Sequence, residues 1–153
     1  MVGREEKVDN EIFYVCSLID YIARKTENKR KLVVNAIGKE KLFHIYDLAD
    51  VYHCENIDKI SDELIEEYNI KIGDFDNVKE CKYKVPTYWD IGKVYKRLII
   101  ELCKNNDKEP IENLIEVYNS WISDKIDNYN SSMYYENPGY IYYSYLEGQP
   151  ILE

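Results

Sequence analysis

Apolar residues recur along most of this chain at intervals of three and four residues, the spacing that places them on one face of an α-helix. The first such pattern begins at a cap residue, Asp9 or Asn10, and continues through Lys25. Its stripe is Ile12, Val15, Cys16, Ile19, Ile22 and Ala23. Because Phe13, Tyr14 and Leu18 widen this stripe, we expect the first helix to be central.

Three shorter patterns follow in the first half of the chain. The segment KRKLVVNAI predicts a second helix that ends at Gly38, since glycine is favoured just after a helix C-terminus. A third helix is predicted over residues 39–53 and a fourth over residues 56–69. The third and fourth each place their apolar residues on one face, as amphipathic helices do.

The helical period is lost over residues 71–86. Turn-forming residues are frequent there, namely Gly73, Asp74, Asp76, Asn77 and Pro86. A short strand around KECKYKV is an alternative, although a lone strand has nothing to pair with. We interpret this segment as an irregular connection between two subregions, 1–70 and 87–153, of one domain that comprises residues 1–153.

Helical periodicity returns after this segment. The sequence TYWD predicts a capping box between Thr87 and Asp90, and the helix that follows extends to about Asn105. Pro110 opens the next predicted helix, over residues 110–129, which carries the clearest apolar stripe of the chain. The pattern as a whole predicts an all-α, single-domain bundle of about six amphipathic helices plus a short C-terminal helix.

That last helix lies in a segment rich in tyrosine, SSMYYENPGYIYYSYLEG, where Asn137-Pro138 begins it and Gly148 ends it. So short a helix must dock on something. We expect Ile141, Tyr145 and Leu146 to pack on the 110–129 helix, so that the segment closes the fold. The alternative is an interface, for which the candidate partner-binding residues are Tyr134, Tyr135, Tyr142 and Tyr143.

Composition and charge limit the partners and the cellular location that we expect for this chain. With 20 basic and 29 acidic side chains the net charge is −9, which repels nucleic-acid phosphates and anionic lipid. No apolar run approaches the length of a membrane span, and no secretory signal is evident, so we expect a cytoplasmic protein. The four cysteines, Cys16, Cys54, Cys81 and Cys103, are then expected to be reduced thiols.

The residues that carry chemistry form no familiar motif. His44 and His53 lie too far apart on one helix to share a metal ion, and the cysteines lack ligand spacing, so we expect no metal. Cys54 adjoins His53, but neighbouring side chains on a helix diverge. Glycines are scattered singly, so no phosphate loop and no cofactor is predicted. The prediction is a protein that is not an enzyme, although a distributed pair of carboxylates stays open.

Nucleic-acid binding is the second possibility. The helices joined at Gly38 could form a helix-turn-helix, for which the candidate DNA-binding residues are Arg30, Lys31, Lys39 and Lys41. The same helices carry Glu40, Asp47 and Asp50, whose carboxylates repel phosphate. We therefore expect nucleic acid to be an unlikely partner.

The segments EIFYVCSLIDYIARKT and VVNAIGKEKLFHIYDLADVYHCENIDKISDEL together resemble a group of small uncharacterised all-α bacterial proteins. The matching parts extend from Phe13 to Tyr21, from Leu32 to Ile37 and from Phe43 to His53. The later segments YWDIGKVYKRLI and VYNSWISDKIDNYNSSMYYENP look like a longer uncharacterised family. Both groups are often encoded beside ADP-ribosyltransferase-like toxins, so the resemblance implies an antitoxin-like or accessory role, and it transfers no catalytic residue.

These observations favour a non-enzymatic protein-interaction module whose partner is another protein, such as the product of a neighbouring gene. Two alternatives remain, a helix-turn-helix regulator and an enzyme of unrecognised type. A cleft that gathers His44, tyrosines and several carboxylates, with a perturbed titration, would support the enzyme.

Overall fold

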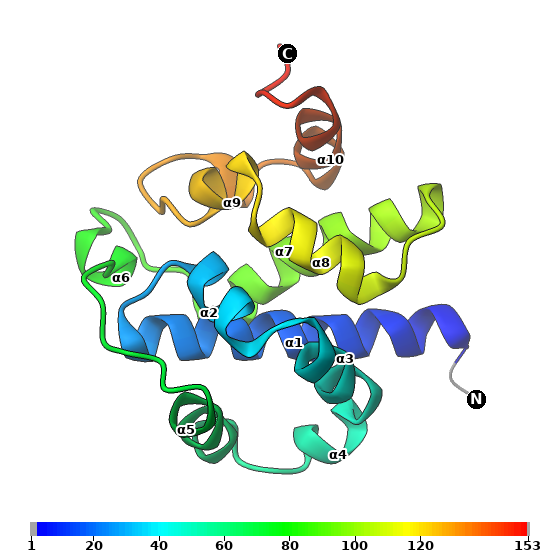
Figure 1. Ribbon diagram of the computed structural model, residues 1–153. Coiled ribbons are helices and arrows are strands. Elements are labelled where there is room, and N and C mark those ends of the chain that lie inside the picture. The colour runs from blue at the N-terminus through cyan, green and yellow to red at the C-terminus, as the bar shows by residue number, and fades with distance from the viewer. Residues whose placement is uncertain (1–2, 153) are drawn as a thin grey trace.

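A computed structural model describes residues 3–152, in which the regular secondary structure is all helical, with no strand. The all-α prediction is confirmed, but the described residues form ten α-helices and one short 3-10 helix rather than about seven helices (Figure 1). The helices are α1 (Arg4–Thr26), α2 (Arg30–Ile37), α3 (Lys39–Asp47), α4 (Ala49–His53), α5 (Ile57–Glu67), α6 (Asn77–Glu80), α7 (Tyr88–Asn105), α8 (Pro110–Tyr118), α9 (Trp121–Ile126), η1 (Met133–Tyr135) and α10 (Pro138–Glu147).

The long helix α1 lies at the centre of the molecule, as its wide apolar stripe predicts. It packs against α7 over much of its length, and it also contacts α2, α3, α4, α5 and α8 (Figure 1). At the α1–α7 contact, a Cβ atom built on Gly92 would collide with Oγ of Ser17 and lie 3.0 Å from the Ser17 Cα and N atoms. Glycine at this position therefore permits the close approach of the two helices.

Two predicted long helices are each broken into two. The 39–53 helix is interrupted at Leu48, whose φ of −108° and ψ of 22° lie outside the helical region, and Ala49, the first residue of α4, is buried. The 110–129 helix is interrupted at Asn119 and Ser120. There the Asn119 side-chain amide donates to the Ile115 carbonyl at 2.9 Å and pairs with Asn35 of α2.

The 71–86 segment is irregular, as predicted, apart from the single turn of α6. It is attached to the C-terminus of α1 by backbone hydrogen bonds of 2.8 Å from Gly73 to Thr26 and from Phe75 to Glu27. The Asn28 side chain adds a bond of 2.7 Å to the Lys71 carbonyl. These hydrogen bonds hold the segment against the end of α1, and the strand considered around KECKYKV does not form.

Ionised side chains are buried where α1, α2 and the chain after α9 meet. Asp20 accepts hydrogen bonds from Arg30 Nε at 2.7 Å and from Arg24 Nε at 2.8 Å, and Asp20 and Arg30 are both fully buried. Both arginines also donate to the Tyr129 hydroxyl, at 3.0 and 3.2 Å. These buried groups thus supply hydrogen bonds and opposite charge to one another, which is the condition under which a protein can bury charged side chains.

The C-terminal helix α10 begins at Asn137-Pro138 and ends at Gly148, as predicted. It packs chiefly on α7 rather than on the 110–129 region, so the expected docking site was wrong. Ile141 is buried as expected, whereas Leu146 is 55% exposed and Tyr142 is buried in its place. The Leu146 prediction failed because this side chain lies in the last turn, farther from the face that carries Ile141 and the fully buried Ser144.

Candidate functional site: an aromatic and acidic groove

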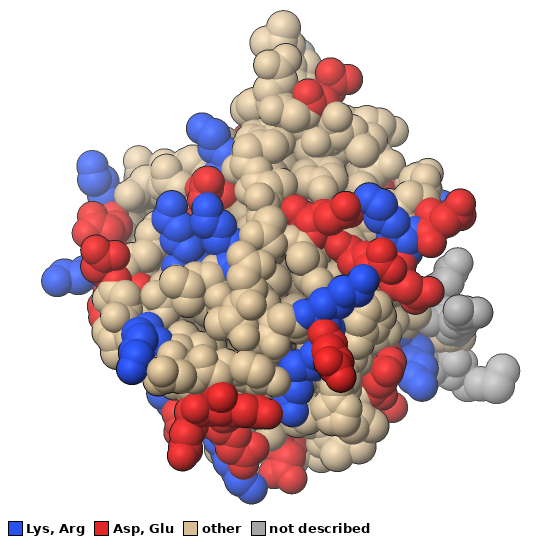
Figure 2. All heavy atoms as spheres, in the orientation of Figure 1, with Lys and Arg blue, Asp and Glu red and all other residues tan. Residues whose placement is uncertain are grey.

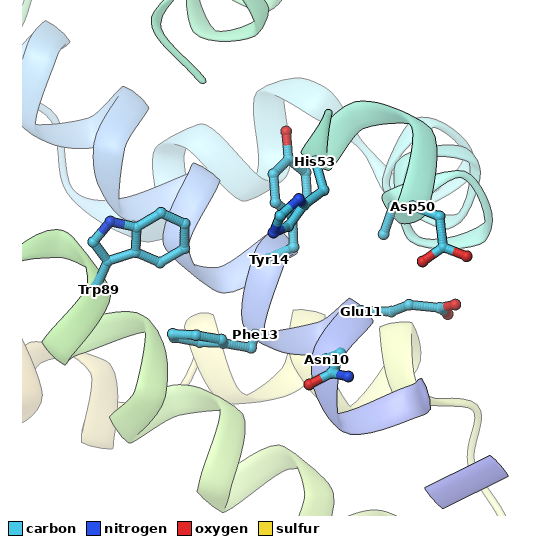
Figure 3. Close-up of a pocket in the computed structure, with 8 residues that line it drawn as sticks. Asn10, Glu11, Phe13, Tyr14, Asp50, His53 and Trp89 are labelled. Carbon is cyan, nitrogen blue, oxygen red and sulfur yellow. The ribbon is translucent and has the colours of Figure 1, made fainter. Parts of the chain in front are cut away.

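An open groove of about 460 Å³ lies between α1, α4 and α7. Helix α1 supplies one wall, α4 supplies the opposite wall and α7 contributes Trp89 (Figure 3). We call it the aromatic–acidic groove and define it by its lining residues, which are Asn10, Glu11, Phe13, Tyr14, Ala49, Asp50, His53 and Trp89.

Local structure places each part of this groove. The break at Leu48 brings α4 over α1, where the Tyr14 hydroxyl donates to the Tyr52 carbonyl at 3.4 Å. The capping box between Thr87 and Asp90 fixes the first turn of α7, with reciprocal bonds of 2.9 and 3.0 Å, and Trp89 lies within that turn. The capping box thus sets where the helix that carries the indole begins.

Aromatic rings form one end of the groove. Phe13 and Trp89 lie there side by side in Figure 3, with their ring centroids 5.4 Å apart. Contacts continue along the surface from Trp89 to Tyr88 at 4.9 Å and from Tyr88 to Tyr21 at 5.0 Å. Trp89 is 39% exposed despite these contacts, so its ring remains available to a ligand.

Two carboxylates form the other end. In Figure 3 the side chains of Glu11 and Asp50 extend to the same side, away from Phe13 and Trp89. Glu11 is only 6% exposed, and Lys7 Nζ, at 3.7 Å, is beyond hydrogen-bonding distance from it. Burial raises the pKa of Glu11, the neighbouring Lys7 lowers it, and the negative charges of Asp50 and Asp47 raise it further.

The groove lacks the geometry of a nucleophilic catalyst. The Cys54 thiol donates to the Asp50 carbonyl at 3.3 Å and so does not serve His53. The Tyr14 and His53 rings contact each other at 6.2 Å, and burial raises the pKa of Tyr14 to about 12, which keeps its phenol protonated. Within residues 3–152, no three histidine, cysteine or carboxylate side chains converge as metal ligands. The arrangement is suited to binding.

His44, the other residue named for an enzyme, lies outside this groove. It belongs to a shallower depression of about 660 Å³ beside α3, together with Glu40, Asp47 and Tyr68. The His44 ring contacts Tyr52 at 6.3 Å. The aromatic–acidic groove therefore contains His53, Glu11 and Asp50, whereas His44 lies in the separate depression beside α3.

The four candidate tyrosines of the C-terminal segment are divided by the fold. Tyr135 and Tyr143 are 69% and 58% exposed, as an interface would require. Tyr142 is buried at 8%, and Tyr134 is half-buried with its ring against Tyr129 at 5.7 Å. Only two of the four thus present most of their rings to solvent, because α10 turns Tyr142 towards α7.

The DNA-binding candidates are divided in the same way. Arg30 is fully buried in its bonds to Asp20 and Tyr129, so its assignment as a phosphate contact was wrong. Lys31 and Lys39 are exposed, and Lys41 lies 3.7 Å from Glu67. Acidic side chains gather over α5 at the lower edge of Figure 2, beside this region.

Sequence reasoning missed the groove residues Glu11, Phe13, Asp50 and Trp89. The available signal was position, since Trp89 precedes the apolar stripe of α7, which begins at Ile91. A large aromatic residue off the buried face suggests a surface role. Contact between Trp89 and Phe13, which are 76 positions apart in the sequence, requires the tertiary structure.

Comparisons of this chain with protein-family models, with curated proteins and with solved structures give no significant match. The family resemblance inferred from the sequence therefore stays a prediction. Within residues 3–152, no helix is long and apolar enough to cross a membrane.

Proposed function

We propose that this chain is a non-enzymatic protein-interaction module that holds its partner in the aromatic–acidic groove. The observation that carries this proposal is the groove itself, an open surface with two aromatic rings at one end and two carboxylates at the other. Aromatic residues in partly buried pockets are the usual anchors of protein interfaces.

The chemistry of the groove supports binding over catalysis. A nucleophile, a base and an orienting group do not meet there, whereas a preformed pocket walled by contacting rings loses little entropy when a ligand enters. The charge of −9 favours a basic partner, because opposite charges accelerate and orient association. The family resemblance adds an antitoxin-like role and makes the protein encoded by the neighbouring gene the first partner to test.

Co-expression with that neighbouring protein tests the proposal. The tagged full chain is expected to retain it, and the Trp89→Ala variant to retain much less. Tyr83→Ala is a matched control, since Tyr83 is an aromatic residue on the irregular segment and is 69% exposed. The proposal fails if no complex forms, or if Trp89→Ala and Tyr83→Ala retain the partner equally well.

A further inference from the structure

We infer that the aromatic end of the groove, together with the rings that continue from it, binds a proline-rich segment of a partner protein in the polyproline II conformation. This inference rests on the proposed protein-binding function and names the chemistry of the segment that is bound. The rings form one continuous surface, which we call the aromatic row and define as Phe13, Trp89, Tyr88 and Tyr21. The carboxylates at the opposite end of the groove take no part in this contact.

The aromatic row follows the contact between α1 and α7. Successive ring centroids along it are no more than 5.4 Å apart. Phe13 and Tyr21 both lie on α1, and the rise of an α-helix between these two positions is about 12 Å. A polyproline II segment rises about 3.1 Å per residue, so about four of its residues would extend along the row. Prolines three positions apart then lie on the same face of the segment, towards the rings.

The row also offers hydrogen-bond donors to a bound backbone. Trp89 is exposed, and neither its indole nitrogen nor the hydroxyl of the half-buried Tyr88 is bonded to another group within residues 3–152. A polyproline II backbone has no internal hydrogen bonds, so its carbonyls are free to accept from these donors. The carbonyls of a bound helix would already be bonded, and an added strand needs a sheet edge, which the described residues lack.

The shape of the surface favours a ligand that is ordered before it binds. The groove that contains Phe13 and Trp89 is open, so it encloses little of a ligand. A proline-rich segment already occupies the polyproline II conformation when free and therefore loses little entropy on binding. Surfaces lined by aromatic rings are a recurrent way in which proteins bind such segments.

The charge beside Tyr21 indicates that basic residues adjoin the prolines. The Tyr21 hydroxyl donates to Asp58 at 2.7 Å, and the Lys25 ammonium group is bonded to both Asp58 and Asp62. One ammonium group shared by two carboxylates leaves a net negative charge at this end of the row. A basic side chain next to the prolines would meet this charge, and the net charge of −9 would attract the same segment from a distance.

Trp89 fluorescence tests the inference on the full chain. The Trp121→Phe variant leaves Trp89 as the reporter, because the chain has two tryptophans. The probe is a short blocked peptide of overlapping P-x-x-P repeats, with alanine at each x and arginines beside the repeats. One comparison peptide replaces its prolines by alanine, and another replaces its arginines by glutamine. We expect a saturable change with the probe, affinity lower by roughly tenfold or more without the prolines, and affinity lower by roughly threefold without the arginines.

Variants in the same background locate the site. Tyr88→Ala is expected to weaken binding of the probe by roughly tenfold, whereas Tyr83→Ala, on the irregular segment, leaves it unchanged. Asp62→Asn is expected to weaken binding of the probe but not of the glutamine peptide, and the exposed Glu63→Gln on the same helix is its control.

Three results would overturn the inference. The first is equal binding of the peptide without prolines, and the second is full binding of the probe by Tyr88→Ala with its circular dichroism unchanged. The third is a basic amphipathic peptide that forms a helix and binds more tightly than the probe, which would indicate a helical partner segment instead.

This experiment and the co-expression test fail separately. If Trp89→Ala releases the neighbouring protein but the proline peptide does not bind, the polyproline assignment fails and the protein-binding function stands. If the proline peptide binds as expected but no complex forms with the neighbouring protein, the proposed function fails in its turn.

Discussion

The Nε atom of Arg30 donates a hydrogen bond of 2.7 Å to the Asp20 carboxylate, and both side chains are fully buried. The same arginine reaches the Tyr129 hydroxyl at 3.2 Å and the Asn28 carbonyl at 3.3 Å. One side chain of α2 is thereby joined to α1 and to the chain that follows α9.

Replacing Arg30 by alanine is expected to lower the free energy of unfolding by about 3 kcal/mol, because a buried carboxylate loses a charged partner and a large side chain leaves a void. Urea denaturation measures the change, and Lys31→Ala at the exposed neighbouring position is the control. A loss for Arg30→Ala no larger than that for Lys31→Ala would contradict a structural role for the buried pair.

Asp127 makes the stability depend on pH. Burial, chiefly, and the neighbouring Asp20 raise the pKa of its carboxyl, Arg30 and the bonds from Tyr95 and Ser123 lower it, and together they bring this pKa to about 7. The unfolded chain releases this proton near pH 4, so the folded state binds the extra proton between about pH 4 and 7. The contribution of Asp127 to the free energy of unfolding is fully present below about pH 4 and is lost as the pH rises to about 7.

Asp127→Asn removes that titration and is expected to flatten the fall in unfolding free energy between about pH 4 and 7. Urea denaturation of both proteins across this range measures the difference, and groups common to the two cancel. Parallel profiles for wild type and Asp127→Asn would show that Asp127 is ionised throughout.

Gly92→Ala is expected to lower the free energy of unfolding by about 1–3 kcal/mol, the cost typical of an overpacked core. The new Cβ would meet the backbone of Ser17, which cannot move without separating α1 from α7. Thermal unfolding measures the effect, with the exposed Lys93→Ala on the same helix as control. A melting temperature equal to that of Lys93→Ala would mean that the two helices can part at little cost.

The C-terminal helix offers a matched pair of variants. Ile141 is 3% exposed on the face of α10 that meets α7, and Tyr143 is 58% exposed on the same helix. Ile141→Ala is expected to cost about 2–4 kcal/mol of unfolding free energy and Tyr143→Ala less than about 0.5 kcal/mol. If the two costs are similar, α10 does not close the fold in the way described.

Local signals in the sequence predicted much of the fold. The capping box at Thr87, proline at the first position of α8 and α10, and glycine after α2 and α10 each depend on neighbouring residues, so they can be recognised without the tertiary structure. The apolar stripe of α1 likewise identified the central helix. These features are set by chemistry within a few residues.

Features that depend on distant residues were not predictable in this way. Arg30 looked like a surface cation because its charged partner Asp20 lies ten positions away and Tyr129 lies 99 positions away. The break at Leu48 carries no glycine or proline, so no local signal in the sequence marks it. The groove depends on that break, so neither its walls nor its chemistry follow from local pattern.

The most direct test of the central claim is the ¹⁵N NMR spectrum of the full chain during addition of the protein encoded by the neighbouring gene. The two tryptophan indoles give separate signals, of which Trp89 lies in the groove and Trp121 lies on α9. We predict that the Trp89 indole signal and the backbone signals of the groove residues shift together with one affinity, while the Trp121 signal stays in place. Shifts that spread equally over both indoles, or that leave Trp89 unchanged at saturating partner, would contradict the account.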